Sequence, residues 1–167
     1  EDLEVGPDAV VGQVNSGFRD TMKNLAGGRI SIAALSVGIG LGAMREALAY
    51  SKERVQFGHA VSEFQAIQWM FADMGTELEA AELMTLRAAA LKDAGRPYTR
   101  EAAMAKLFAS EAAMRATIKA VQVFGGYGYT QEYPAERYMR DAKLCEIGEG
   151  TSEVQRIIIA RDLIRSH

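Results

Sequence analysis

A carboxylate stands directly before a predicted helix start near the end of the chain. Glu149 and Gly150 precede the start, at Thr151 or Ser152, and Ser152 and Gln155 have the spacing of a capping box. Because the glycine leaves room above the backbone for a ligand, Glu149 is a candidate general base. An acid in the first turn that only stabilises its helix is the alternative, and the motif alone leaves it open.

Two other motifs have the residue types that bind a nucleotide. Arg54, Gln56 and Phe57 place a guanidinium, a carboxamide and an aromatic face at the predicted end of the first long helix, which suits phosphate and adenine. Gly125 and Gly126 follow a long helix and bring bare backbone amides near the surface. The alternatives are a solvated helix end for the first motif and a helix C-cap with a turn for the second.

Other suggestive residues point to structure rather than chemistry. The glycines at 38, 40 and 42 resemble a dinucleotide loop only superficially, because no strand precedes them, and we expect close helix packing there. His59 and His167 lack companions at metal-ligand spacing, so we predict no metal. Cys145 is the single cysteine, and the fold therefore needs no disulfide.

The composition limits the possible classes of protein. A chain of 167 residues with 49% hydrophobic and 25% charged residues is typical of one globular domain. The net charge of -3 disfavours nucleic-acid binding. The most apolar stretch, residues 30–44, is shorter than the roughly 18 residues that a membrane span requires, so we expect no span.

The residues that position these motifs are predicted to be helical. Glycines and Pro7 predict a lead-in segment of turns over residues 1–28, and a helical bundle domain over residues 29–167. Helical spacing and helix-end signals place the first helix over residues 29–55 and the second from 62 or 63 to 93–95. The third covers residues 100–124 with Thr99 as its N-cap, the fourth covers residues 134–143, and the last begins at 151 or 152. The expected fold is all-α, a four-helix bundle with short additional helices.

Apolar residues at helical spacing predict the buried side of each helix. In the first helix these are Ile32, Leu35, Ile39, Leu41, Met44 and Leu48. In the second they are Phe64, Ile67, Phe71, Met74, Leu78 and Ala81. In the third they are Met104, Leu107, Met114, Ile118 and Val121. In the last they are Val154, Ile157, Ile158 and Ile164.

Six landmarks in this order resemble the C-terminal half of acyl-CoA dehydrogenases over nearly the whole chain. They are residues 28–30, 54–58, 64–68, 122–128, 140–143 and 149–156. The resemblance implies oxidation of an acyl-CoA thioester to its trans-2-enoyl form by flavin adenine dinucleotide (FAD), with electrons passing to electron-transfer flavoprotein. It also implies a homotetramer, or at least a dimer, in the bacterial cytoplasm or the mitochondrial matrix.

The same resemblance assigns roles to individual residues. Glu149 matches the base that removes the α proton, and its backbone amide helps to polarise the thioester carbonyl. Arg29 and Gly150 match positions that contact substrate, and Thr151 and Glu153 match positions that approach the flavin beside the base. The residues matching the site for the nucleotide end of a neighbouring subunit's FAD are Arg54, Gln56, Phe57, Gln65, Gln122, Gly125 and Gly126.

Departures from the family pattern leave other functions open. Some relatives carry the base just before the residue that matches Arg29, where this chain has Gly28, and Gly148 replaces a common aromatic residue. Residues 1–28 match the exit of a preceding β domain, and the rest of the family's N-terminal half has no counterpart, so we expect this chain alone to be inactive. The alternatives are an acyl-CoA oxidase and a non-catalytic helical subunit that completes a partner's flavin site.

Overall fold

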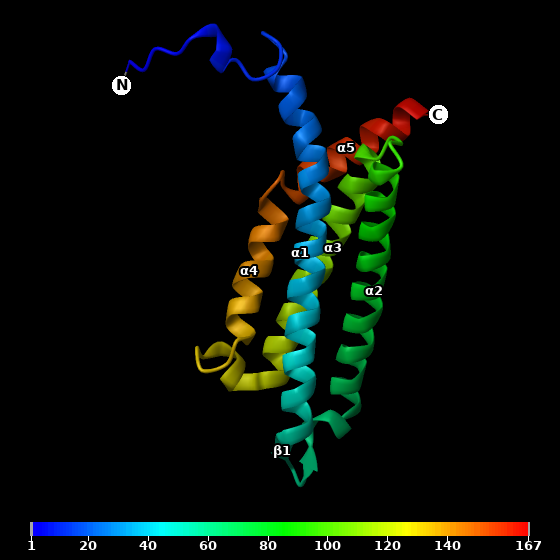
Figure 1. Cartoon of the computed structure of the whole chain (residues 1–167). Helices are drawn as coiled ribbons and strands as arrows, with labels where there is room; N and C mark the ends of the chain where they lie inside the picture. The colour runs from blue at the N-terminus through cyan, green and yellow to red at the C-terminus, as the bar shows by residue number, and fades with distance from the viewer. Residues whose placement is uncertain (1, 167) are drawn as a thin grey trace.

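The computed structural model describes residues 2–166, so His167 lies outside the described residues. Within that range the chain forms five α-helices, three short 3-10 helices and one two-stranded hairpin (Figure 1). The α-helices are α1 (Gly17–Glu53), α2 (Gln65–Asp93), α3 (Thr99–Phe124), α4 (Ala135–Ile147) and α5 (Ser152–Ser166). The predicted all-α bundle is therefore confirmed.

Helix α3 is the centre of the bundle and packs against each of the other four long helices. Its buried face consists mainly of alanines, which let neighbouring helices approach closely. Helix α1 runs the length of the molecule beside it, with α4 and α2 on either side (Figure 1). A stack of Tyr50 on Phe124, with ring centroids 4.4 Å apart, fixes the lower end of α1 against α3.

Helix α1 begins at Gly17, well before the predicted start at Arg29. Gly27 and Gly28 are typical of a turn in sequence, but both lie inside the helix, and neighbouring side chains occupy the space where a Cβ would stand. Residues 2–16 contain only a 3-10 turn, η1 (Pro7–Ala9), and extend away from the bundle (Figure 1). The assignment of residues 1–28 to a preceding domain stays a prediction.

The other helix boundaries agree closely with the prediction, with small corrections. Helix α2 begins at Gln65 rather than at 62 or 63, because a 3-10 turn, η2 (Val61–Glu63), comes first. The N-cap of α3 is Tyr98 and not Thr99, which is already helical. Helix α4 continues to Ile147, beyond the predicted end at Lys143.

The buried faces of α1 and α5 differ from the prediction. Leu35 and Leu48 of α1 are exposed, as are Val154, Ile157 and Ile164 of α5. The prediction is also wrong for Ile118 of α3, which is exposed. Small residues form the buried stripe of α1 instead, at Ala33, Ser36, Gly40, Ala43 and Ala47. The large side chains therefore point outward because the helices approach too closely to admit them.

The prediction for α2 is largely confirmed, whereas the close packing expected at the glycines of α1 is found at Gly40 and Gly42 and is wrong for Gly38. Met74, Leu78 and Ala81 are buried in α2 as expected. A Cβ at Gly40 would clash with Leu78, and one at Gly42 would lie 3.0 Å from the Tyr138 ring. The backbone of α3 also approaches Gly40, where the Cβ would lie 3.5 Å from Ala113 Cα. A Cβ at Gly38, by contrast, would meet no neighbouring atom within 4 Å.

A short hairpin, which the sequence did not predict, turns the chain from α1 into α2. Strands β1 (Val55–Gln56) and β2 (His59–Ala60) pair antiparallel, with Val55 opposite Ala60. The two turn residues, Phe57 and Gly58, have φ values of 53° and 82°. Two consecutive positive φ angles are typical of the tightest hairpin turns.

Helix α1 is long and apolar enough, by length and composition, to cross a membrane, although the sequence analysis expected no span. A core helix of a bundle meets the same criterion. In this fold a third of the apolar window of α1 is buried, along the small-residue stripe that packs against α3.

Candidate functional site

Glu149 lies in the short loop between α4 and α5 and has a left-handed backbone. Its φ angle is 57°, and that of Gly150 is 95°. For a residue other than glycine, such a conformation costs about 1–3 kcal/mol and persists only where the surroundings enforce it. The loop therefore holds Glu149 in one particular orientation.

The carboxylate of Glu149 lies directly against α1 at Gly28. A Cβ built on Gly28 would be 2.5 Å from Glu149 Oε2 and 2.9 Å from Oε1. Only a glycine leaves this space free. The absence of a side chain at position 28 is thus a requirement for the observed position of Glu149, a role that the sequence analysis did not assign.

Arg29 is the next residue of α1 and is 5% exposed. Burial lowers the pKa of its guanidinium, while the charges of Glu149 and Tyr98 act in the opposite direction. The electrostatic interaction with Glu149 shows that the predicted base and the predicted substrate-contacting arginine lie close together.

Buried polar atoms without a hydrogen-bond partner concentrate in this region. Among residues 2–166 four such side-chain atoms occur, namely Arg29 Nε, Glu149 Oε2, Ser152 Oγ and Gln155 Oε1. All four lie around the Glu149 loop. Because buried polar groups are nearly always paired, this cluster marks a place where a ligand can supply the missing partners.

Two buried donors hold the backbone of the loop. Lys106 Nζ of α3 donates hydrogen bonds to the carbonyl oxygens of Glu146, at 3.2 Å, and Gly150, at 2.9 Å. Gln155 Nε2 donates to the carbonyl oxygens of Gly150, at 2.8 Å, and Glu149, at 3.3 Å. Lys106 was not among the predicted site residues, although a lysine within an alanine stripe is a visible signal in the sequence.

The N-terminus of α5 is capped by Thr151 and not by the predicted Ser152–Gln155 capping box. Thr151 Oγ1 accepts a hydrogen bond from the backbone N–H of Val154 at 3.5 Å. Ser152 Oγ has no partner, and the Gln155 side chain turns back to the loop. Glu153 is exposed, and hydrogen bonds from its own backbone amide and from Thr151 lower its pKa.

At the opposite end of α1, four of the residues predicted to bind a nucleotide line one open hollow of about 510 Å³: Arg54, Gln56, Gly125 and Gly126. The Arg54 guanidinium lies over the Tyr127 ring, 5.5 Å from its centroid.

Gly125 ends α3 with a φ of 61°, and space is open beside both glycines of the hollow. A guanidinium, a carboxamide and accessible backbone around one hollow fit the phosphates and base of a nucleotide.

The remaining residues predicted for the nucleotide site surround this end without lining the hollow. Phe57 is 92% exposed at the hairpin tip, with its ring 6.4 Å from that of Phe64. Gln65 is the first residue of α2, and Gln122 lies in the last turn of α3, both exposed. These three side chains face solvent in the single chain.

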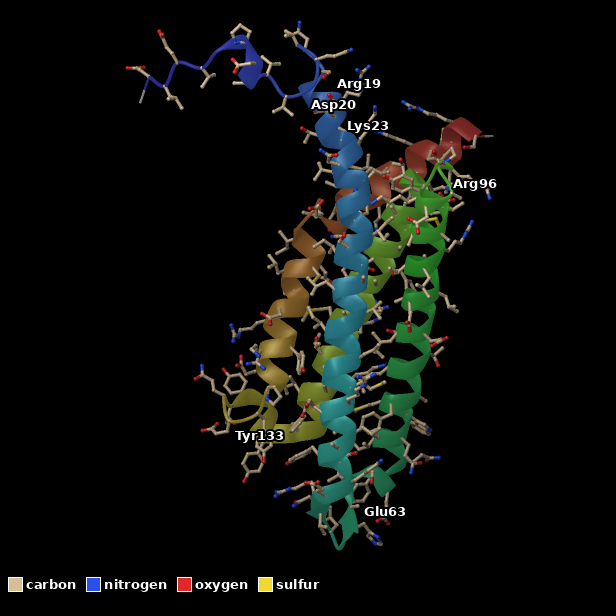
Figure 2. All side chains as sticks on the ribbon, viewed as in Figure 1. Arg19, Asp20, Lys23, Glu63, Arg96 and Tyr133 are labelled. Carbon is tan, nitrogen blue, oxygen red and sulfur yellow. The ribbon has the colours of Figure 1, made fainter. Side chains whose placement is uncertain are left out.

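We call the two regions the base end, around Glu149 and Gly28, and the nucleotide end, around Arg54 and Gly125. Arg54 follows Gly28 by 26 residues of continuous helix, so a rise of 1.5 Å per residue separates them by about 39 Å. In Figure 2, Lys23 lies on α1 beyond the base end, and Tyr133 lies near the nucleotide end. A single chain therefore does not bring the two groups of residues together.

Comparison with known proteins identifies close relatives of this chain. The family model described as "Acyl-CoA dehydrogenase, C-terminal domain" matches residues 15–164. A short-chain specific acyl-CoA dehydrogenase of Clostridium acetobutylicum is 53% identical over 99% of this chain and 44% of its own length. The butyryl-CoA dehydrogenase structure of Megasphaera elsdenii has a TM-score of 0.97 at 47% identity, covering 99% of this chain and 43% of that one.

A second solved structure, described as electron transferring flavoprotein of Acidaminococcus fermentans, also has a TM-score of 0.97. It is 54% identical and covers 99% of this chain and 43% of the matched chain. The chain thus spans less than half the length of the proteins that it matches.

Proposed function

This chain belongs to the acyl-CoA dehydrogenase family, and we propose that the full-length protein containing it oxidises an acyl-CoA thioester to trans-2-enoyl-CoA. The observation that carries the proposal is the Glu149 carboxylate, held by a left-handed loop against Gly28 with its Oε2 buried and without a partner. Relatives named for short-chain and butyryl substrates support a short acyl chain.

In this proposal Glu149 removes a proton from the carbon next to the thioester carbonyl. The carbonyl oxygen gains negative charge as the proton leaves, and the backbone N–H of Glu149 stabilises that charge. A bound FAD supplies the acceptor for the hydride that leaves the β carbon, so that a carbon–carbon double bond forms. Arg29 and Gly150 hold the substrate beside the carboxylate.

The geometry also supports a cofactor site shared between chains. Family members are flavoproteins, and we assign the nucleotide end to the FAD of a neighbouring subunit. Thr151 and Glu153 lie beside the FAD at the base end. The two ends are separated by about 39 Å along one helix, so we assign them to two different FAD sites. Each site then needs a second chain, which supports a homotetramer or dimer.

Partner and compartment follow from the same assignment. The match to a structure described as electron transferring flavoprotein supports electron-transfer flavoprotein as the acceptor of electrons. Cys145 is a buried free thiol, which suits the reducing interior of bacteria or the mitochondrial matrix. A non-catalytic assembly subunit is disfavoured, since it has no need for an unpaired carboxylate in a strained loop.

The deciding experiment is anaerobic reduction of the flavin in the full-length protein by a panel of acyl-CoA thioesters. We expect at least one thioester to bleach the flavin absorbance of the parent protein. In Glu149→Gln nearly all of this flavin reduction should be lost. Glu136→Gln is the matched control, because Glu136 forms an exposed ion pair with Arg140 on α4.

Three results would change the proposal. Unreduced flavin in the parent protein contradicts dehydrogenation, and undiminished reduction in Glu149→Gln removes Glu149 as the base. Rapid reoxidation of the reduced flavin by oxygen, in place of electron-transfer flavoprotein, assigns the protein to the acyl-CoA oxidases.

A further inference from the structure

Lys106 is a charged residue in the least expected place in this fold. It lies on the central helix α3, within the alanine stripe, and is 0% exposed. None of the ion pairs found among residues 2–166 includes it. Its Nζ instead donates to the two carbonyl oxygens of Glu146 and Gly150.

Burial of this ammonium group carries a cost that an apolar side chain avoids. Burial lowers the pKa of Lys106, an effect that Cys145, Glu146 and Glu153 oppose and that the charge of Arg29 reinforces. These groups come from α4, α5 and α1, which surround α3 at this level. A residue that only filled the space would fit here as methionine or leucine, so the charge itself needs an explanation.

The two carbonyls that Lys106 binds stand on either side of the proposed base. Glu146 lies in the last turn of α4, where a helix leaves carbonyl groups without partners of its own. Gly150 directly follows Glu149. Lys106 therefore bridges the end of α4 and the start of α5, and the intervening loop is fixed at both ends by one side chain.

The bridge acts on a backbone that is under strain. Glu149 is left-handed with a φ of 57°, and such a conformation is maintained by its surroundings. Gln155 Nε2 shares the Gly150 oxygen with Lys106 and also contacts the Glu149 oxygen. The loop is thus held from α3 and from α5 at once, without any contact to the Glu149 carboxylate itself.

We propose that Lys106 is a positioning residue that fixes the backbone of the Glu149 loop, so that the carboxylate and the N–H of Glu149 reach the α carbon and the carbonyl oxygen of one bound thioester together. Gln155 is its partner in this role. The proposal rests on the function proposed above for Glu149.

The test uses the full-length flavoprotein with Lys106→Met, which keeps an unbranched side chain, one atom shorter, and removes the donors. The matched control is Lys119→Met on the same helix, because Lys119 forms an ion pair with Asp73 near the surface. Anaerobic stopped-flow reduction by the acyl-CoA that bleaches the parent fastest gives the limiting rate and the substrate dissociation constant separately. Flavin content and thermal midpoint are measured on every variant.

We expect Lys106→Met to reduce the limiting rate about 100-fold, as a displacement near 1 Å of a reacting group does. We expect the dissociation constant to stay within about threefold, because the loop acts on the reacting atoms more than on binding.

A second readout is the infrared C=O stretch of bound enoyl-CoA. Its shift toward lower frequency in the parent should shrink in Lys106→Met, since the Glu149 N–H no longer donates in line.

Three outcomes overturn the proposal. These are a limiting rate in Lys106→Met no lower than in Lys119→Met, an unchanged C=O stretch, and a loss confined to flavin content or thermal midpoint. If Lys106→Met does not fold, Gln155→Met decides, and a parental rate and stretch in that variant also overturn the proposal. Failure of the proposed function is a separate result, because the parent protein itself then shows no reduction by any acyl-CoA.

Discussion

The base end and the nucleotide end are built in opposite ways. At the base end, Lys106, Gln155 and Arg29 are buried, and hydrogen bonds from two helices hold the loop. At the nucleotide end, Arg54 and Gln56 are exposed and line an open hollow. Contacts within one chain hold the loop of the first region, whereas the second region is an open surface.

The contrast fits the roles proposed for the two ends. A proton-abstracting group works only within a small tolerance of position, so its surroundings must be rigid. A cofactor's phosphates and adenine need favourable contacts over a large area, and exposed groups on a hairpin and a turn provide these on assembly. The base end is therefore expected to be rigid, and the nucleotide end is expected to be accessible to its ligand.

The largest effect should come from filling the space beside the base. In Gly28→Ala the new Cβ would occupy the position of the Glu149 carboxylate, which must then swing away. We expect a loss of about 100-fold in the limiting rate of flavin reduction, with little change in flavin content. A parental rate in this variant would show that the base end tolerates more movement than the structure indicates.

The second prediction tests whether the base end and the nucleotide end of one site come from different chains. Arg54→Ala should weaken flavin binding about 10- to 100-fold, the value of a hydrogen bond to a charged group, whereas Lys52→Ala should not. Co-expression of Arg54→Ala with Glu149→Gln should then restore part of the activity, because one chain supplies an intact base end and the other an intact nucleotide end. Mixed oligomers without activity would place both ends of one site in the same chain.

A smaller effect concerns pH and the buried lysine. Because burial lowers the pKa of Lys106 in the folded state, the unfolded state holds its proton to higher pH. The stability of the parent relative to Lys106→Met should therefore rise with pH from the lowered value up to the ordinary value of 10.5, by about 1.4 kcal/mol per unit of lowering. Thermal midpoints of both proteins across that range test this, and a constant difference contradicts it.

The smallest expected effect concerns the part of α1 between the two ends. Gly38→Ala should stabilise the protein by about 1 kcal/mol, because the position is helical and the new Cβ would meet no neighbouring atom within 4 Å. Gly42→Ala should gain less or lose stability, since its Cβ meets the Tyr138 ring at 3.0 Å. Thermal unfolding of the pair measures the difference, and equal gains would mean that Tyr138 moves aside freely.

Much of the fold was predictable because helical spacing and helix ends are local properties. The end of α3 at Phe124 and the buried Met74 and Leu78 of α2 follow from periodicity and glycine. The start of α1 was not predictable, because Gly27 and Gly28 are turn residues by type, and the reason for a glycine at position 28, the space taken by the Glu149 carboxylate, lies in a distant part of the sequence. The contact of Gly28 with Glu149 joins residues from opposite ends of the sequence.

The site was predictable in its residue types and only in part in its geometry. The motifs around Arg54 and Gly125 converge on one hollow as expected, and Glu149 lies beside Arg29. Lys106 escaped notice because a lone lysine on a helix is normally solvated, and only the backbone of a distant loop explains its burial. Sequence patterns identify candidate catalytic and ligand-binding side chains. They do not identify a side chain whose role is to donate a hydrogen bond to the backbone carbonyl of a distant loop.

Helix α1 runs without interruption from Gly28 to its C-cap residue, Arg54. Its length is therefore as important as its composition. Inserting one residue midway would rotate one end against the other by about 100° and shift it by about 1.5 Å. Such a change leaves every motif intact and yet misaligns two reaction centres at once. The segment between them is therefore a spacer whose residue count is fixed more strictly than its residue identities.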